Sequence, residues 1–564
     1  MKVVQRRNLL AISVLLLLTA LLIVACNTAQ PQTVEKVVER TVVVEKQVTA
    51  VVEKEVTTVV EKEVAVVVTA TPEPTEAPPS EPVPGGTLRV GMIQDIPDFD
   101  AYSRNFFYWP IARNIYDTLI RYDHSLNPQP QLAESWEIAD DGLSITLHLR
   151  EGVKFHDGSD FTSAAVAANL ERATDAARGV HQYNANRNVE SWETPDDYTV
   201  VIKYSKPTPA GLMLDALDQL PIISPETLDT ETLKTKAIGT GPFMVAEKVP
   251  GDHVTLKRFD GYWKEGLPYL DEIILKPFTD PDAMVLALEA GTLDFIQDTP
   301  YKDVRRLENS LVVNRGQAGA LYYNLYLNVY KEPFTNKLVR QAIQYALDRE
   351  TIVGQALFGV GEVKWTAWPE YSVAWDDKWK NYYPYDLEKA KALITEAGYP
   401  DGFETAITVL AGNPDMVAIA EILQADLLTI GVKTQILVLD TGTYYDWHLS
   451  GNYPGIHISF GANSNKYPAA QFTGSHYRVE NNVLLKPDGF WPEAYVENVK
   501  LGEETLDPEE QHQAYVAATE AMLDESWVIE YSWKFLVFTH HPYVQGFDYT
   551  VESMPLFEAV WLAK

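Results

Sequence analysis

The stretch that decides the fold reads Gln131-Leu-Ala-Glu-Ser-Trp136, Asp140-Asp-Gly142 and Leu147-His-Leu-Arg-Glu-Gly-Val-Lys-Phe-His-Asp-Gly158. Apolar residues at every second position, Ile145, Leu147 and Leu149, predict a strand with one buried face. His156 and Asp157 are adjacent, and neighbouring residues on a strand point to opposite faces. The pair therefore indicates a structural turn rather than a catalytic dyad.

Helices and strands alternate along the rest of the chain. We expect strands at 198–204, 253–259 and 433–439, and helices at 162–172, 338–347, 386–397, 416–430 and 509–523. Asp160 or Thr162 is expected to cap the first of these helices, and Gly398 to follow the third. Interleaved helices and strands predict an α/β protein with more than one sheet.

Taken together, the quoted stretch resembles the signature of the extracytoplasmic solute-binding proteins of family 5, the oligopeptide, dipeptide, nickel and oligosaccharide binders of ABC importers. Further matching pieces follow in the expected order: Gly239-Thr-Gly-Pro-Phe243, Asn336-Lys-Leu-Val-Arg-Gln-Ala-Ile-Gln-Tyr-Ala-Leu-Asp-Arg349, Tyr399-Pro-Asp-Gly402 and Leu427-Leu-Thr-Ile-Gly-Val-Lys433. The resemblance covers 85–564. It implies an α/β, two-lobed periplasmic-binding-protein-like (type II) fold with an extra inserted subdomain in lobe one.

The resemblance also implies a domain map and a mechanism. Lobe one is expected at 85–318, with the inserted subdomain at about 126–215, lobe two at 319–537, and a return to lobe one at 538–564. In such a clamp the ligand touches both lobes only when they close, so differential affinity drives closure. The expected partner is an ABC permease complex that recognises the closed form.

Residues 1–25 are predicted to be a lipoprotein signal peptide. A basic start is followed by an apolar run at 9–24, about 24 Å long as a helix and short of the roughly 30 Å hydrocarbon core of a bilayer. Ile23-Val24-Ala25-Cys26 resembles a lipoprotein box, in which Cys26 is the lipidated residue; an ordinary cleavage site is the alternative. We therefore expect an extracytoplasmic protein anchored to the cell membrane through lipid.

Residues 26–84 are predicted to form a lipid-anchored stalk and linker. A valine-rich repeat of eight residues starts at Thr41, Thr49 and Thr57, and this period fits neither a heptad nor an eleven-residue repeat. A β-prone, low-complexity stalk is favoured, with a short coiled coil as the alternative. Six prolines between 69 and 84 favour an extended spacer without a packed core.

The composition argues against several function classes. The 564 residues carry 46 Lys and Arg against 79 Asp and Glu, a formal charge of −33, which repels nucleic-acid phosphates. One cysteine cannot build a cysteine-rich metal site, and His540-His541 lacks further ligands at suitable spacing, so we expect no metal and no other cofactor. We expect a binding protein rather than an enzyme, because no nucleotide-binding, zinc-protease or serine-hydrolase motif occurs. A surface-anchored hydrolase and a sensory or adhesive protein are the alternatives.

The expected ligand is an oligopeptide, with an oligosaccharide as the alternative. Peptide binders of this family hold the ligand amine with an Asp in a Gly-Trp-x-Gly/Ala-Asp segment, where this chain has Phe460-Gly-Ala-Asn463. Dipeptide binders pair the ligand carboxylate with an Arg in the loop that here reads Ala411-Gly-Asn-Pro-Asp415. A charge enclosed without a partner is costly, so these changes predict an uncharged or weakly charged solute, unless Asp440, Asp446 or another carboxylate substitutes.

Aromatic side chains are the other candidate contacts. The 13 Trp, 30 Tyr and 19 Phe favour surfaces on which sugar rings or peptide side chains stack. The candidates are Trp365, Trp368, Tyr444, Tyr445 and Trp447 in lobe two, and Tyr108 and Trp109 in lobe one. Core or surface packing is the alternative for each, but we expect at least two of them to line the cleft.

Overall fold

A computed structural model describes residues 81–564 apart from 103–108, 179, 181, 463–478 and 480–481. The predicted signal peptide, Cys26 and nearly all of the predicted stalk lie outside the described residues, as do Tyr108 and Asn463. The folded part belongs to one compact unit, Glu76–Lys564. Within the described ranges, no helix has both the length and the apolar character needed to cross a bilayer.

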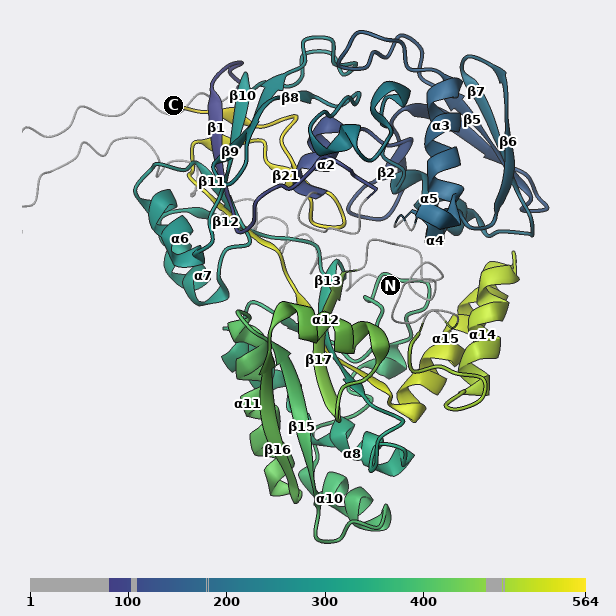
Figure 1. Cartoon of the computed structure of the whole chain (residues 1–564), viewed down its shortest axis with the longest axis vertical. Coiled ribbons are helices and arrows are strands. Elements are labelled where there is room, and N and C mark those ends of the chain that lie inside the picture. Colours follow the sequence, from purple (N-terminus) through teal and green to yellow (C-terminus); the bar gives the residue numbers. More distant parts are fainter. Residues whose placement is uncertain (1–80, 103–108, 179, 181, 463–478, 480–481) are drawn as a thin grey trace, which may run out of the picture. The chain divides into compact units, whose positions relative to one another are not determined.

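The first large sheet has seven strands in the order β12-β19-β11-β1-β10-β9-β8. Its central strand β1 runs parallel to both β10 and β11, while β9 and β19 are antiparallel to their neighbours. Helices α6 (Pro281–Glu289) and α7 (Tyr301–Leu307) lie beside it in Figure 1. The strands are β1 (Thr87–Met92), β8 (Phe243–Val249), β9 (His253–Arg258), β10 (Glu272–Pro277), β11 (Phe295–Gln297), β12 (Val312–Arg315) and β19 (Val537–His540).

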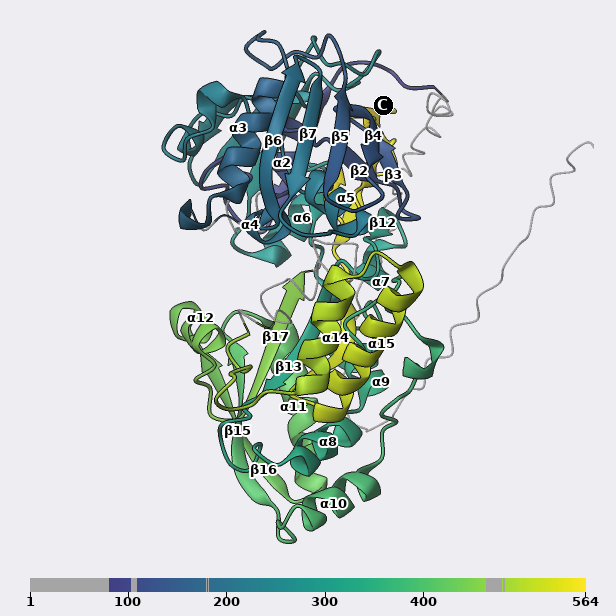
Figure 2. The same cartoon turned by 90° about the vertical axis from the view of Figure 1, so that its right-hand side faces the viewer.

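A four-stranded antiparallel sheet is inserted between β1 and β8, in the order β4-β5-β7-β6. The predicted alternation is confirmed in β5, where Ile145, Leu147 and Leu149 are buried. Helices α3 (Ser163–Thr174), α4 (Tyr183–Asn186) and α5 (Ala210–Asp218) accompany this sheet (Figure 2). The strands are β4 (Ala133–Ile138), β5 (Ser144–Leu149), β6 (Val189–Asp196) and β7 (Thr199–Tyr204), after a short pair β2 (Ile120–Tyr122) and β3 (Pro128–Pro130).

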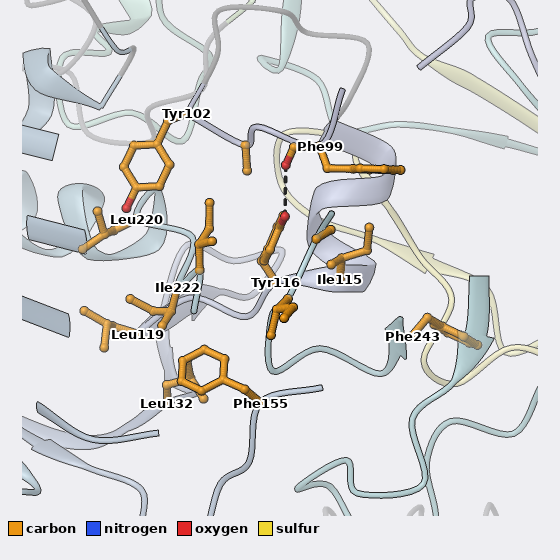
Figure 3. Close-up of a cluster of buried hydrophobic side chains, with 14 of the residues drawn as sticks. Phe99, Tyr102, Ile115, Tyr116, Leu119, Leu132, Phe155, Leu220, Ile222 and Phe243 are labelled. Carbon is orange, nitrogen blue, oxygen red and sulfur yellow. Dashed lines mark hydrogen bonds between the residues drawn. The ribbon is translucent and has the colours of Figure 1, made fainter. Parts of the chain in front are cut away.

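A buried cluster joins the inserted sheet to the rest of its lobe. Figure 3 shows Tyr116 just beyond helix α2 (Trp109–Ile115), with its hydroxyl donating to the Phe99 carbonyl at 3.0 Å. His156 has a structural role there, as predicted, because its ring nitrogens lie 3.0 Å from the Gly241 carbonyl and 3.3 Å from the Gly239 amide. A Cβ on Gly239 would lie 2.1 Å from the Ile115 carbonyl, so the Gly-Thr-Gly turn permits this close backbone packing.

The second large sheet has six strands in the order β14-β18-β13-β17-β15-β16. Strand β15 is parallel to β16 and β17, and β13 is antiparallel to β17 and β18. The strands are β13 (Leu321–Leu327), β14 (Glu362–Val363), β15 (Phe403–Leu410), β16 (Val432–Leu439), β17 (Ile456–Ala462) and β18 (Val528–Lys534).

The helices that accompany this sheet begin at conventional caps. Asn336, Asp386 and Asn413 accept hydrogen bonds from the first turns of α8, α10 and α11, which satisfies amides that the helix leaves free. The predicted helices are confirmed within a few residues at each end. They are α8 (Lys337–Ala346), α10 (Leu387–Glu396), α11 (Pro414–Thr429) and α15 (Pro508–Glu525), with α12 (Thr441–Ser450) and α14 (Glu493–Glu504) in addition.

The chain passes between the two large sheets twice. It leaves β12 after Arg315 and enters β13 at Leu321, and it returns from β18 after Lys534 to β19 at Val537. Beyond β19 the C-terminal segment forms two short pairs, β20 (Val544–Gln545) with β23 (Trp561–Leu562) and β21 (Asp548–Tyr549) with β22 (Pro555–Leu556). The lobe that contains β1 and β19 is called lobe one below, and the lobe that contains β13–β18 is called lobe two.

Candidate ligand-binding site

The carboxyl ends of three parallel strands meet at one edge of the lobe-two sheet. The 411–415 loop follows β15, Asp440 follows β16, and position 463 follows β17. Leu321 at the start of β13 pairs with Ala462 and with Lys534, so both passages between the lobes reach this edge. Ligands of open α/β sheets bind outside the carboxyl ends of the strands, which makes this edge the candidate site.

Asp415 is the half-buried carboxylate of the edge, in the first turn of α11. The Tyr323 hydroxyl donates to its Oδ2 at 3.0 Å. Burial raises the pKa of the Asp415 carboxyl above its usual value, the positive charge of Lys534 opposes this rise, and the negative charge of Asp298 adds to it. Asp415 is thus a carboxylate whose charged form would be stabilised further by an additional cation.

Lys534 is the half-buried cation of the edge, at the end of β18. Its ammonium lies 5.9 Å from the ring centroids of both Tyr323 and Phe460, at the outer limit of a cation–π contact. Phe460 lies on β17 opposite Tyr323 of β13 and packs partly against the core of lobe two. Lys534 and Asp415 therefore lie at this edge together with the aromatic rings of Tyr323 and Phe460.

Asp440 has a structural role at the same edge. Its carboxylate caps α12, accepting from the Thr443 amide at 3.1 Å and from the Thr443 hydroxyl at 2.7 Å. These bonds from Thr443 lower the pKa of the Asp440 carboxyl. Asp440 and Asp446 are both exposed. Asp440 is thus the ionised N-cap of α12, and its use as a ligand contact stays a prediction.

The predicted aromatic residues of α12 differ in exposure. Tyr444 is buried in the core, and its hydroxyl donates to the Ile458 carbonyl at 3.0 Å. Trp447 is half-buried against the cluster beneath α14 and α15. Tyr445 is 41% exposed. Of these three residues, Tyr445 presents the largest open surface to a solute.

The predicted tryptophan pair is divided between core and surface. Trp368 is 1% exposed, and its indole donates to the Thr519 hydroxyl of α15 at 2.6 Å. Trp365 is half-buried. A stacking role for Trp368 is not supported, because its ring faces are enclosed by core residues. Trp109 lies in α2, but its side chain is outside the described part of the structure.

Lys364, next to Trp365, is enclosed in lobe two. Its ammonium lies 2.5 Å from Glu530, 4.0 Å from the Trp533 ring centroid and 4.2 Å from that of Tyr322. Burial lowers the pKa of Lys364 to about 8, although the Glu530 carboxylate opposes the change. This pair was not predicted from the sequence, because Glu530 is far along the chain and reaches Lys364 only through the β14–β18 pairing.

The two adjacent histidines bond to protein groups. His540 lies with its Nε2 2.9 Å from the Asn314 amide, and His541 with its Nε2 2.9 Å from the Leu288 carbonyl. Among the residues that the structure describes, no group of three His, Cys, Asp or Glu side chains could hold a metal ion.

Comparison with known proteins decides the family. Residues 127–479 match the model of the bacterial extracellular solute-binding proteins, family 5 Middle. The chain belongs to this family. As a family 5 protein it is the substrate-binding component of an ABC transporter and acts outside the cytoplasm, and family 5 proteins are transport binding proteins rather than enzymes.

Its relatives bind different small solutes. The glutathione-binding protein GsiB of Escherichia coli O1:K1 / APEC is 31% identical over 458 residues, which cover 78% of this chain and 86% of that protein. AgaA of A. tumefaciens R10, solved with agropinic acid, is 28% identical with a TM-score of 0.73, covering 85% of this chain and 99% of that one. DppA of Helicobacter pylori, solved with the peptide STSA, is 26% identical with a TM-score of 0.73, covering 86% and 99%. The predicted family and the two-lobed α/β type II fold are confirmed.

The family 5 motifs did not reveal the two half-buried charged residues of this edge, Asp415 and Lys534. Asp415 belongs to the 411–415 loop, which the family pattern distinguishes only by its missing Arg. Lys534 belongs to a strand more than a hundred residues further on, so only the pairing of β18 with β13 brings it to the edge. A lysine at the end of an apolar strand, just before the predicted return to lobe one, was the available signal.

Proposed function

We propose that this chain is a substrate-binding lipoprotein of an ABC importer, which captures an oligopeptide-class solute by lobe closure and delivers it to the permease. The observation that supports the peptide class is the presence of two half-buried side chains of opposite charge, Asp415 and Lys534, at the edge reached by both passages between the lobes. A peptide carries an ammonium and a carboxylate, and these two side chains offer the opposite charges. The similarity to a glutathione-binding protein favours the same class.

In this proposal the ligand ammonium pairs with Asp415 and the ligand carboxylate with Lys534. Phe460 and Tyr445 supply apolar surface for ligand side chains, and Trp365 extends it. The proposed solute is therefore more strongly charged than predicted from Asn463 and from the missing Arg in the 411–415 loop, because Asp415 and Lys534 replace the two missing charges. Enclosing these groups in a closed cleft strengthens each charge pair, since water no longer screens it.

Lobe closure is energetically within reach of such a ligand. Micromolar binding corresponds to about 8 kcal/mol, more than the few kcal/mol that separate two lobe arrangements. We place lobe one at 85–318, the inserted subdomain at about 126–215, lobe two at 319–537 and the return to lobe one at 538–564. Residues 1–25 direct export, Cys26 carries the lipid, and 26–84 hold the lobes away from the membrane.

The ligand class is tested by calorimetry with three probes. We expect tetra-alanine to bind, and N-acetyl-tetra-alanine amide, which lacks both charges, to bind at least about tenfold more weakly. Maltotetraose is the third probe. Equal affinity for the two peptides would contradict the roles of Asp415 and Lys534, and tighter binding of the sugar would favour the oligosaccharide alternative. Native mass spectrometry of the protein as purified gives an independent answer through the mass of any retained ligand.

The anchor is tested separately. In cells that express the full chain, we expect labelled palmitate to be incorporated, and we expect a Cys26→Ser variant to take up none. Incorporation by both proteins, or by neither, would contradict lipidation at Cys26 and leave the solute-binding proposal intact.

A further inference from the structure

Helix α14 ends on two glutamates that are unfavourable for the helix by itself. Glu503 and Glu504 are its last residues, where the helix dipole is negative and cations are preferred. A local conflict of this kind is expected where a distant partner requires it. Figure 2 shows α14 beside α15, below the inserted sheet of lobe one.

The partners of both glutamates come from the inserted subdomain of lobe one. Arg187, directly after α4, donates through Nη2 to both oxygens of Glu503 at 3.2 and 3.1 Å. The two side chains are only 12% and 11% exposed. Lys206, beyond β7, lies 3.4 Å from Glu504, and this pair is 34% and 43% exposed. A largely buried charge pair is worth more than an exposed one, because solvent screens it less.

An apolar contact lies beside these ion pairs. Leu506, in the turn after α14, packs directly on Gly142 in the Asp140-Asp-Gly142 turn, where an added Cβ would lie 2.8 Å from a Leu506 methyl. Leu212 of α5 packs against the lobe-two cluster beneath α14 and α15. The inserted subdomain and the α14–α15 hairpin thus share ionic and apolar contacts that do not involve the two covalent passages.

The lobe-two side of this contact is rigidly supported. Tyr515 and Gln511 of α15 both donate to the Gly502 carbonyl, at 2.7 and 2.8 Å. A Cβ on Gly502 would lie 2.2 Å from the Tyr515 ring, so the glycine permits close packing of the two helices here. Asp507 caps α15 by accepting from the Glu509 and Glu510 amides, both at 2.9 Å. The turn therefore presents Glu503 in a fixed position.

We propose that Arg187 and Glu503 form a latch between the lobes, which biases the ligand-free clamp toward the closed arrangement. Glu503 is held on a rigid turn and Arg187 on the facing subdomain, so this ion pair forms only while the two surfaces are in contact. The latch acts at a place distinct from the ligand site and rests on the proposed lobe closure. A clamp biased in this way needs less differential ligand affinity to close.

The test is a distance measurement on ligand-free protein. Spin labels are placed at Glu151→Cys in lobe one and Lys391→Cys in lobe two, both exposed, in a Cys26→Ser background because Cys26 is the single native cysteine. We expect Glu503→Gln to raise the population with long label distances at least about threefold. Glu504→Gln is the matched control, since it removes the neighbouring but exposed pair, and we expect a much smaller change.

A charge-reversal variant provides the second part of the test. The Arg187→Glu, Glu503→Arg double variant is expected to restore the wild-type distance distribution, which simple damage to the fold would not allow. Equal effects of the two glutamate variants, or no effect of Glu503→Gln, would overturn the latch. Should a single variant fail to fold, the reversal variant decides, because recovery of fold and distance supports the latch and failure to recover overturns it. These measurements contain no ligand, so failure of the peptide probes would contradict the proposed solute and leave this result standing.

Discussion

Strand β18 carries two charged side chains, four residues apart, in opposite surroundings. Glu530 is buried in lobe two with Lys364 at 2.5 Å, and both side chains are less than 3% exposed. Lys534, at the end of the same strand, is half-buried beside the rings of Tyr323 and Phe460. Residue type therefore does not distinguish a structural charge from one that can pair with a solute. The burial of the side chain and its position in the sheet make this distinction.

The largest effect is expected when the buried Lys364–Glu530 ion pair is broken by substitution. Lys364→Met leaves the Glu530 carboxylate buried without its cation, and we expect a loss of about 4 kcal/mol in the free energy of unfolding. Urea denaturation followed by tryptophan fluorescence measures it. The Lys364→Met, Glu530→Leu double variant is the control, and we expect it to recover most of the loss, because both buried charges are removed. A single variant as stable as the native protein would contradict the assignment of this pair to the fold.

Trp365 and Trp368, three residues apart, show the same contrast between a half-buried and a buried side chain. Trp368 lies in the core, so Trp368→Ala opens a cavity and is expected to cost about 3 kcal/mol of stability. Trp365 is half-buried, so Trp365→Ala is expected to change the melting temperature little and to weaken tetra-alanine binding. Thermal denaturation and calorimetry on both variants separate the two effects. Equal melting temperatures for the two variants would contradict the assignment of Trp368 to the core and Trp365 to the ligand site.

A charged network in lobe one predicts how the stability of the protein changes at acidic pH. Glu558 bonds Lys264 and Tyr262 and faces Arg121, and although burial opposes them these groups hold the pKa of its carboxyl at about 2. The stability it contributes is present above its unfolded pKa, near 4.5, and is lost as the pH falls toward 2, with about 2 kcal/mol of the loss reached by pH 3. We expect this part of the acid sensitivity to be absent in Glu558→Gln, as measured by urea denaturation at pH 5, 4 and 3. Parallel curves for the two proteins would contradict it.

Asp117 acts in the opposite direction in the same network. It accepts from Thr240 and Trp263, and burial raises the pKa of its carboxyl. A group whose folded pKa is raised favours the folded state as it takes up a proton, so Asp117 offsets part of the loss at Glu558. The Asp117→Asn variant is therefore expected to lose more stability on acidification than the native chain does.

The smallest effect is expected at the half-buried Asp415 of the candidate ligand site. Asp415→Asn keeps the shape of the side chain and removes its charge, so we expect binding of tetra-alanine to weaken about tenfold with little change in melting temperature. Glu421→Gln, on an exposed position of the same helix, is the matched control. Calorimetry that gives one affinity for both variants would remove Asp415 from the ligand site.

Periodicity and motifs predicted much of the secondary structure. The alternation at 144–149 and the capped helices at 386–397 and 416–430 were found where expected, because local propensity and burial agree there. The aromatic candidates were harder. Trp365 and Trp368 look alike in the sequence, and Tyr444 looks like Tyr445, yet their exposures differ. Irregular loops such as the one that carries Trp365 and Trp368 have no period from which to infer the buried side.

By itself the sequence determined the family, the α/β class and the interleaved order of helices and strands. Each of these depends on neighbours along the chain, whose spacing is written in the residues. The tertiary structure alone decided which charges are enclosed, which meet at the sheet edge and which span the two lobes. Lys364 and Glu530, Asp415 and Lys534, and Arg187 and Glu503 are all more than a hundred residues apart. Pairing over such separations depends on strand register and lobe contact, and no local pattern encodes these.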